Sequence, residues 1–135
     1  MKKINVFLGV LTLLMLIGFS GKVHAQSAPV MYFCEKYDNG EVGISDRFSK
    51  GYLTVMVKCD YALGLSNVTI QFDKYNASTS KFEYSKDFPY DVTPDMKYIF
   101  FASKDLAFDK AGIYRVFLLD GSRKTVASAL IEIIN

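Results

Sequence analysis

The sequence predicts an all-β protein, folded as a single antiparallel β-sandwich of about seven strands over residues 26–135. Three observations predict it. Apolar and polar side chains alternate in residues 52–59 and 67–73, which is typical of half-buried antiparallel strands. Clusters of Gly, Pro, Asn, Asp and Ser separate such stretches at short intervals. Residues 26–135 have the length of one domain, and they contain no amphipathic helix of useful length.

The expected strands follow one another along the chain with turn signals between them. In residues 52–59, Leu53, Val55 and Val57 share one face, while the residues between them point away. The seven predicted strands comprise residues 30–37, 52–59, 67–73, 81–86, 96–102, 112–119 and 125–134. The predicted turns comprise residues 38–40, 60–66, 76–80, 89–94 and 120–122. Short strands separated by frequent turns favour a sandwich.

The first 25 residues look like a signal peptide. Lys2 and Lys3 precede a mostly apolar run over residues 4–19, and Ala25 is the small residue that a signal peptidase requires. The apolar run is shorter than the roughly 20 residues of a membrane-spanning helix. We therefore expect export to the periplasm or out of the cell, with a mature chain that begins at Gln26 and does not span a membrane. A retained signal anchor is the alternative.

Removal of the signal changes the charge and the available chemistry. The full chain carries a net charge of +2, but three lysines belong to the signal, so the mature chain has a net charge of −1 and no basic footprint for nucleic acid. His24 is the only histidine, and it also lies in the signal. The mature chain therefore cannot use Ser-His-Asp or Cys-His catalysis, or a histidine-ligated metal. We expect no enzyme, no cofactor and no metal site. The alternative is an enzyme that uses only carboxylates, Lys, Tyr or Ser, such as a glycosidase with a pair of acids.

Residues 109–116, Asp-Lys-Ala-Gly-Ile-Tyr-Arg-Val, carry a resemblance to a known fold family. They resemble the turn and strand F of immunoglobulin-like domains, which read Asp-x-Ala/Gly-Gly/x-x-Tyr-x-Cys. The resemblance implies an immunoglobulin-like or fibronectin type III-like sandwich in which Tyr114 forms a tyrosine corner, its hydroxyl bonded to nearby backbone. Val116 stands where antibody domains have their second cysteine, and the chain has no Trp, so the resemblance is to the wider superfamily.

Cys34 and Cys59 are the only cysteines of the chain. An even number of cysteines in an exported protein favours a disulfide. Antiparallel pairing of strands 30–37 and 52–59 would bring the start of one strand beside the end of the other. We therefore expect a disulfide between Cys34 and Cys59.

The last two predicted strands carry more apolar residues than a one-sided sheet requires. The surplus residues, expected on an outer face, are Ile113, Phe117, Leu119, Val126 and Leu130. A contiguous exposed apolar patch often marks a protein-binding surface. We expect this face to mediate self-association or to bind another protein, unless a loop or the N-terminal segment covers it.

Two weaker patterns suggest small ligands. Asp87, Asp91 and Asp95 lie close together in the sequence, but their spacing lacks the alternating acids and the glycine of a calcium-binding EF-hand loop, and solvated turn residues explain them better. Five tyrosines near strand ends would form a glycan-stacking platform if they clustered: Tyr37, Tyr61, Tyr75, Tyr84 and Tyr90.

These observations favour a non-catalytic binding role. We expect an exported immunoglobulin-like module that acts by binding protein at the cell envelope or outside the cell. The alternative is a carbohydrate-binding or adhesion module on the same scaffold.

Overall fold

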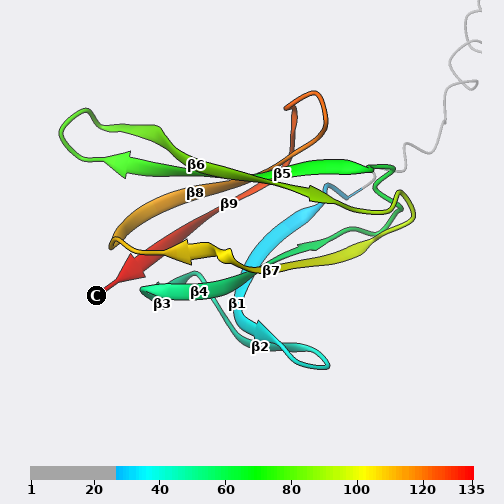
Figure 1. Ribbon diagram of the computed structural model, residues 1–135, viewed down its shortest axis with the longest axis horizontal. Helices are drawn as coiled ribbons and strands as arrows, with labels where there is room; N and C mark the ends of the chain where they lie inside the picture. The colour runs from blue at the N-terminus through cyan, green and yellow to red at the C-terminus, as the bar shows by residue number, and fades with distance from the viewer. Residues whose placement is uncertain (1–26) are drawn as a thin grey trace, which may run out of the picture.

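The computed structural model describes residues 27–135, and the expected signal peptide lies outside them. The described chain forms nine β-strands (Figure 1). The strands are β1 (Val30–Tyr37), β2 (Glu41–Ser45), β3 (Arg47–Ser49), β4 (Gly51–Lys58), β5 (Asn67–Asn76), β6 (Lys81–Asp91), β7 (Tyr98–Phe108), β8 (Gly112–Leu119) and β9 (Thr125–Ile134). Nothing helical in residues 27–135 has the length and apolarity needed to cross a membrane.

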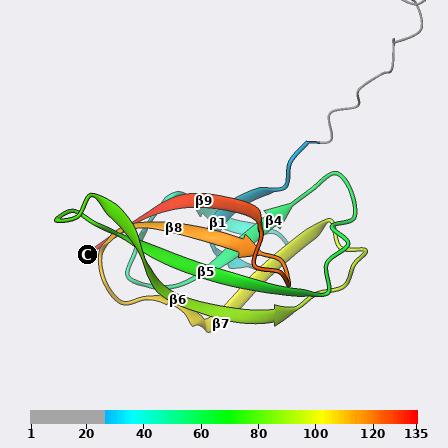
Figure 2. The ribbon, with the colours of Figure 1, turned by 90° about the horizontal axis from the view of Figure 1, so that it is seen from above.

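The strands form two sheets that stack face to face. One sheet has four strands in the order β2-β1-β4-β7, and the other has five in the order β3-β9-β8-β5-β6. Figure 2 shows the five-stranded sheet lying across the four-stranded one. The chain crosses between the sheets after β2, β3, β4, β6 and β7, so neighbours within each sheet are mostly distant in sequence. The predicted β-sandwich is therefore confirmed.

The order of pairing is that of an immunoglobulin-like domain. β5, β6, β8 and β9 take the places of strands C, C′, F and G, and β1, β4 and β7 take those of A, B and E. Near the start of β8, the Tyr114 hydroxyl donates a hydrogen bond to the Lys110 carbonyl at 2.8 Å, which is the bond that the resemblance implies for a tyrosine corner. Burial raises the pKa of Tyr114, so this hydroxyl keeps its proton.

The core lies between the sheets and is built by the inward-facing residues of both. The largest fully buried aromatic residues are Phe33, Phe72 and Phe108. The Phe108 ring stacks on Phe72 at 4.7 Å between centroids and meets the Tyr114 ring edge-on at 4.9 Å. Phe108 ends β7 in one sheet, whereas its two partners belong to the other sheet. These contacts join the layers directly above the tyrosine corner.

Strands β2 and β3 correct the expected count of seven and the expectation of a purely antiparallel sandwich. β2 returns along β1 after a tight turn in which Asn39 has a φ of 53°. β3 pairs with β9 in parallel, with Phe48 opposite Ile133. β3 is only three residues long, and its partner is the last strand of the chain, so no local pattern announces the pair.

Strands β6 and β7 run past their predicted ends. Residues 89–91 belong to β6 rather than to a turn, and Pro89 lies opposite Thr69. Proline is tolerated there because β6 is an edge strand and does not need every backbone donor. β7 continues past a bulge, since Thr54 pairs with Ala102 but Tyr52 pairs with Ala107.

Lys86 of β6 connects the two sheets at the side of the sandwich where β6 and β7 lie. Its ammonium donates hydrogen bonds to the carbonyls of Asp105 and Ala107 in the bulged part of β7. The same ammonium lies 5.2 Å from the centre of the Phe72 ring and 5.9 Å from that of Phe108. Burial lowers the pKa of Lys86, because the charged form loses part of its hydration.

Candidate functional site

The predicted partner surface on β8 and β9 is brought together only in part. Ile113 and Leu130 are both exposed and border a shallow hollow of about 340 Å³ beside the Arg47–Glu132 ion pair. Leu119, by contrast, is buried, and Val126 packs against the core. These two residues correct the prediction: the register shifts beside Leu119 in the β8–β9 pair, so strict alternation fails there.

Phe117 is half-buried and lies beneath a charged side chain. The Arg115 guanidinium stacks between two rings, 4.9 Å from the centre of Phe117 and 4.7 Å from that of Phe82 on β6. Across the same face, Arg123 bonds Gln71 at 2.8 Å and Asp87 at 3.0 Å. Charged groups therefore interrupt this outer face.

The expected disulfide is wrong: Cys34 and Cys59 are separate, buried free thiols. β1 and β4 pair with Cys34 opposite Thr54 and Val30 opposite Lys58. Cys59 thus lies five residues beyond the position opposite Cys34, or about 16 Å along the strand. A disulfide requires α-carbons within about 7 Å.

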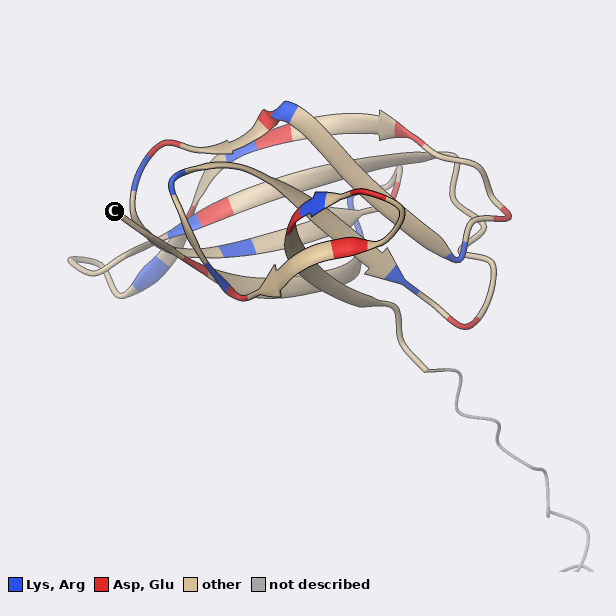
Figure 3. Cartoon of the chain, turned by 90° about the horizontal axis from the view of Figure 1, so that it is seen from below, with Lys and Arg blue, Asp and Glu red and all other residues tan. Residues whose placement is uncertain are grey.

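The more apolar outer surface belongs to the four-stranded sheet. Ten large apolar side chains are exposed in the described chain, and six of them lie on β1, β2, β4 and β7: Val30, Val42, Ile44, Tyr52, Tyr98 and Phe100. Figure 3, which views this side of the molecule, shows Lys, Arg, Asp and Glu of both signs scattered over loops and strands. We call these six residues the exposed face of the four-stranded sheet.

Below this face lies a second, smaller apolar layer. Met56 and Cys34 are fully buried although they are not part of the core between the sheets. Their neighbours on the same strands, Val55 and Phe33, point into that core. Met56 and Cys34 must therefore be covered from outside, by side chains that lie over the four-stranded sheet.

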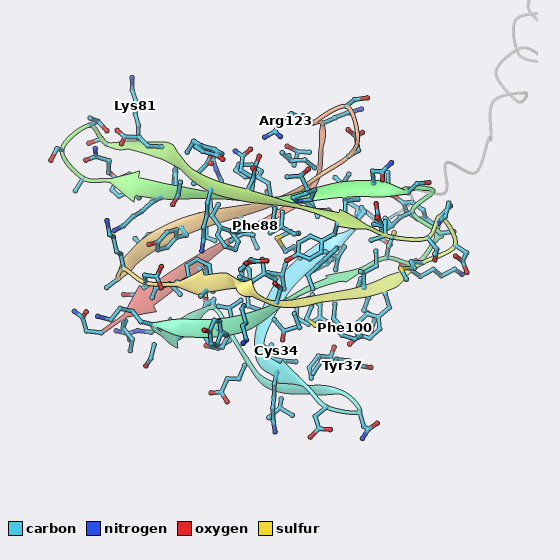
Figure 4. The ribbon with its side chains drawn as sticks, viewed as in Figure 1. Cys34, Tyr37, Lys81, Phe88, Phe100 and Arg123 are labelled. Atoms are coloured by element: carbon cyan, nitrogen blue, oxygen red, sulfur yellow. The ribbon has the colours of Figure 1, made fainter. Side chains whose placement is uncertain are left out.

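The cover is an aromatic cluster that joins the β1–β2 hairpin to β7 (Figure 4). Tyr37 stacks on Phe100 with 4.5 Å between ring centroids and 7° between ring planes, and it meets Tyr98 edge-on at 6.1 Å. Tyr32 and Phe100 lie on the two sides of Met56 in the sheet register. The four rings and the Glu41 carboxylate are called the outer aromatic cluster below.

Glu41 fixes the hairpin in this position by hydrogen bonding. The Tyr32 hydroxyl donates to Glu41 Oε1 at 2.5 Å. This bond, a second from the Tyr98 hydroxyl and the nearby Lys58 charge lower the pKa of Glu41 from its usual 4.5 to about 2. Burial and the bond to Glu41 raise the pKa of Tyr32, so the pair persists as carboxylate and phenol over a wide pH range.

The pH dependence of stability tests the hydrogen bond between Tyr32 and Glu41. Because the pKa of Glu41 is lower in the folded protein than in the unfolded chain, its contribution is present above pH 4.5 and is lost as the pH falls to about 2. Glu41→Gln should therefore show a shallower loss of unfolding free energy across this window, measured by urea titrations at a series of pH values. Tyr32→Phe, which removes the strongest bond, should flatten the curve in the same way. If the unfolding free energy of both variants falls with acid as steeply as that of the wild type, the bond between Tyr32 and Glu41 does not stabilise the fold.

The five tyrosines considered for a glycan platform do not gather. Tyr37 belongs to the outer aromatic cluster, whereas Tyr75 and Tyr84 lie on the five-stranded sheet. Tyr90 packs against Phe101 in the core. Tyr61 lies in the loop after β4, beside Cys59. No single platform results.

The acidic residues considered for calcium are also dispersed. Asp87 accepts a hydrogen bond from Arg123, Asp91 ends β6 opposite Asn67, and Asp95 lies in the loop after it. Within residues 27–135, no three side chains of His, Cys, Asp or Glu are placed to hold a metal ion.

An open cleft of about 500 Å³ lies between the β5–β6 hairpin and the β7–β8 turn. Lys74, Lys86 and Lys110 line it, together with Glu83 and Asp109. Glu83 already accepts hydrogen bonds from Asn76 and Thr79. Charges of both signs thus share the cleft.

Two short runs in the sequence could have revealed the outer aromatic cluster. Val55-Met56-Val57 and Ile99-Phe100-Phe101 are apolar at every position, whereas a strand with one wet face alternates. These runs lie side by side in β4 and β7, with Met56 opposite Phe100. An apolar residue at every position of both runs therefore indicates that the outer face of these strands is apolar as well.

Comparisons with known proteins concern the fold alone. No protein-family model matches the sequence, and no curated protein matches it. Among solved structures, the chain is similar to an immunoglobulin-like protein from Pseudomonas aeruginosa, at 10% sequence identity. The similarity covers 82% of this chain and 99% of that one, with a TM-score of 0.49.

Proposed function

We propose that this protein is an exported, non-catalytic immunoglobulin-like module that binds protein through the exposed face of its four-stranded sheet. The main support for this proposal is that six of the ten large exposed apolar residues of the described chain lie on this sheet. Exposed aromatic and apolar residues of this kind are typical of the centre of a protein interface.

The rigidity of this face supports the proposal. The Tyr37–Phe100 stack and the Tyr32–Glu41 bond hold the hairpin against β7, so exposed rings such as Phe100 are fixed before a partner arrives. Binding a preorganised surface costs less side-chain entropy than ordering a mobile one. On the opposite sheet, the charged side chains of Arg115 and Arg123 lie among the exposed apolar residues and divide them.

Site-specific photo-crosslinking in cells tests the role of this face. A photoreactive phenylalanine analogue would replace Tyr52, which is 67% exposed on β4, or Tyr84, which is 62% exposed on β6 of the other sheet. We expect discrete protein adducts from position 52 and none from position 84. Adducts from position 84 alone, or none from either position, would refute this binding face.

The export part of the proposal has its own readout. The chain recovered from the periplasm or the medium should have the mass of residues 26–135. Recovery only as the full-length chain in the membrane fraction would instead support a retained signal anchor.

A carbohydrate-binding role is the alternative, since Tyr52, Tyr98 and Phe100 present aromatic rings on one sheet. Tyr and Phe rings can stack on sugars, but Phe100 already stacks on Tyr37 and has one ring face engaged. A glycan array would reveal this role as binding to a defined sugar that is lost in Tyr98→Ser.

A further inference from the structure

The two sheets have four free edges, and these edges differ in how they are protected. The edge strands are β2 and β7 of the four-stranded sheet and β3 and β6 of the five-stranded sheet. An edge strand presents unpaired backbone groups that can pair with another strand, and proteins block such pairing by bulges, prolines, charged residues or short length. A regular edge without such a block is therefore a candidate interaction surface.

Three of the four edge strands are interrupted or too short. β2 is broken at its centre by Gly43, which has a φ of 67° and no partner in the register with β1. β3 has only three residues. β6 contains Pro89, and four of its first seven residues are charged. Ser85 also bulges out of the pairing of β6 with β5, between Tyr84 and Lys86. None of these strands offers a long, uninterrupted edge.

The first part of β7 is a regular edge. Residues 98–102 pair with β4 in unbroken register, from Tyr98 opposite Lys58 to Ala102 opposite Thr54. No residue of this stretch has a positive φ, and the bulge of β7 and the bonds from Lys86 lie beyond it. Its sequence, Tyr-Ile-Phe-Phe-Ala, contains no charged residue and no proline, and it has high strand propensity.

The register shows which backbone groups this edge leaves unpaired. In an antiparallel pair, residues alternate between those bonded to the partner strand and those whose N–H and C=O point away from it. The Cys59 N–H donates to the Lys97 carbonyl at 2.7 Å, so Lys97 is bonded to the β4 side, and the same holds at every second residue after it. The residues in between, Tyr98, Phe100 and Ala102, therefore direct their N–H and C=O groups to the open side of β7, where the sheet has no further strand.

We propose that residues 98–102 pair in antiparallel fashion with the same residues of a second copy of this chain, about a two-fold axis at Phe100. A two-fold contact uses the same patch on both subunits, so the patch must be complementary to itself. The three residues that face the open side meet this condition, because they are spaced symmetrically about Phe100. Tyr98 lies opposite Ala102 of the second copy, and Phe100 lies opposite Phe100. Each such pair can exchange both N–H···O bonds.

The side chains agree with this register on both faces of the sheet. On the outer face, where Figure 4 shows Phe100, the two Phe100 rings meet at the axis, and each Tyr98 ring lies beside Ala102 of the other copy. Phe100 is 49% and Tyr98 37% exposed in the single chain, so the pairing covers apolar surface. Aromatic pairs across neighbouring strands stabilise a sheet. On the inner face, Ile99 lies opposite Phe101, and both belong to the core.

The residues that flank the stretch also permit the pairing. Lys97 precedes it and Ser103 follows it, and these two residues lie opposite each other across the axis, so like charges do not meet there. The result is one continuous sheet through both copies, in which the exposed faces of the two four-stranded sheets lie side by side. This pairing goes beyond the binding role proposed for the exposed face and does not depend on it.

Light scattering on residues 26–135, which include every strand described, tests the proposal across a concentration series. The wild-type mass should rise from one chain to two. Ala102→Pro removes a backbone donor on the open side of β7 and spares the bonds to β4, a position at which an edge strand tolerates proline. It should therefore remove the doubled mass. Ala102→Ser keeps the donor at the same position, and as the matched control it should retain the doubled mass.

Hydrogen exchange of the wild-type chain, resolved to single residues, does not depend on the folding of a variant. The amides of Tyr98, Phe100 and Ala102 should exchange slowly where the mass is doubled and rapidly where it is that of one chain. The amides of Ile99 and Phe101, which are bonded to β4, should be protected at both concentrations. A single-chain mass at every concentration would overturn the proposal. So would a doubled mass in which the three edge amides stay unprotected, or one that a folded Ala102→Pro variant retains.

Discussion

Phe108→Ala should lower the free energy of unfolding by about 3–5 kcal/mol, the range for removing a buried phenylalanine. Phe108 is 2% exposed and joins the sheets through its contacts with Phe72 and Tyr114. Loss of the ring would leave a void beside the Lys86 ammonium, which lies 5.9 Å from the centroid of the Phe108 ring. Urea unfolding followed by circular dichroism measures the change.

Phe100→Ala is the matched control for this prediction. It removes the same side chain from the same strand, but Phe100 is 49% exposed and points away from the core. We expect it to cost about 1 kcal/mol or less, mainly from the lost stack on Tyr37. Equal costs at the two positions would show that Phe108 does not connect the layers as described.

The sandwich itself was predictable because its signal is local. Alternation of Leu53, Val55 and Val57 places one face of β4 in the core, and all three residues are buried there. The motif around Tyr114 likewise predicts a contact only four residues away, the bond to Lys110. Both signals are complete within one short segment.

The pairings between distant segments were less accessible. The distance from Cys34 to Cys59 depends on the register of β1 against β4, and sliding the strands by five residues would have brought the cysteines together. The register is set by which apolar residues of both strands face the other sheet, and two isolated segments do not reveal this. β3 illustrates the same limit, because its partner β9 is the last strand in the chain.

The apolar outer face predicted on β8 and β9 is only partly exposed for a related reason. The β8–β9 hairpin looked doubly apolar, but Leu119 is drawn inward by a register shift and Phe117 lies beneath Arg115. On the four-stranded sheet, Met56 lies between Tyr32 and Phe100, and these two residues are contacted by Glu41 and Tyr37 of the β1–β2 hairpin. Side-chain packing between non-neighbouring strands decides both outcomes.

Met56→Ala gives the second large effect, because it opens the small apolar layer under the outer aromatic cluster. A residue that points outward from a sheet normally costs less than about 0.5 kcal/mol to truncate. Met56 points outward but is fully buried, with Tyr32 and Phe100 on either side in the register. We therefore expect the free energy of unfolding to fall by about 2–4 kcal/mol, as for a core methionine.

Tyr52→Ala provides the comparison, since Tyr52 points outward from the same strand and is 67% exposed. It should change stability by no more than about 0.5 kcal/mol in the same urea titrations. The difference between the two variants measures how firmly the β1–β2 hairpin covers β4. If Met56→Ala costs as little as Tyr52→Ala, the hairpin does not rest on the sheet, and the rigid exposed face would lose its structural support.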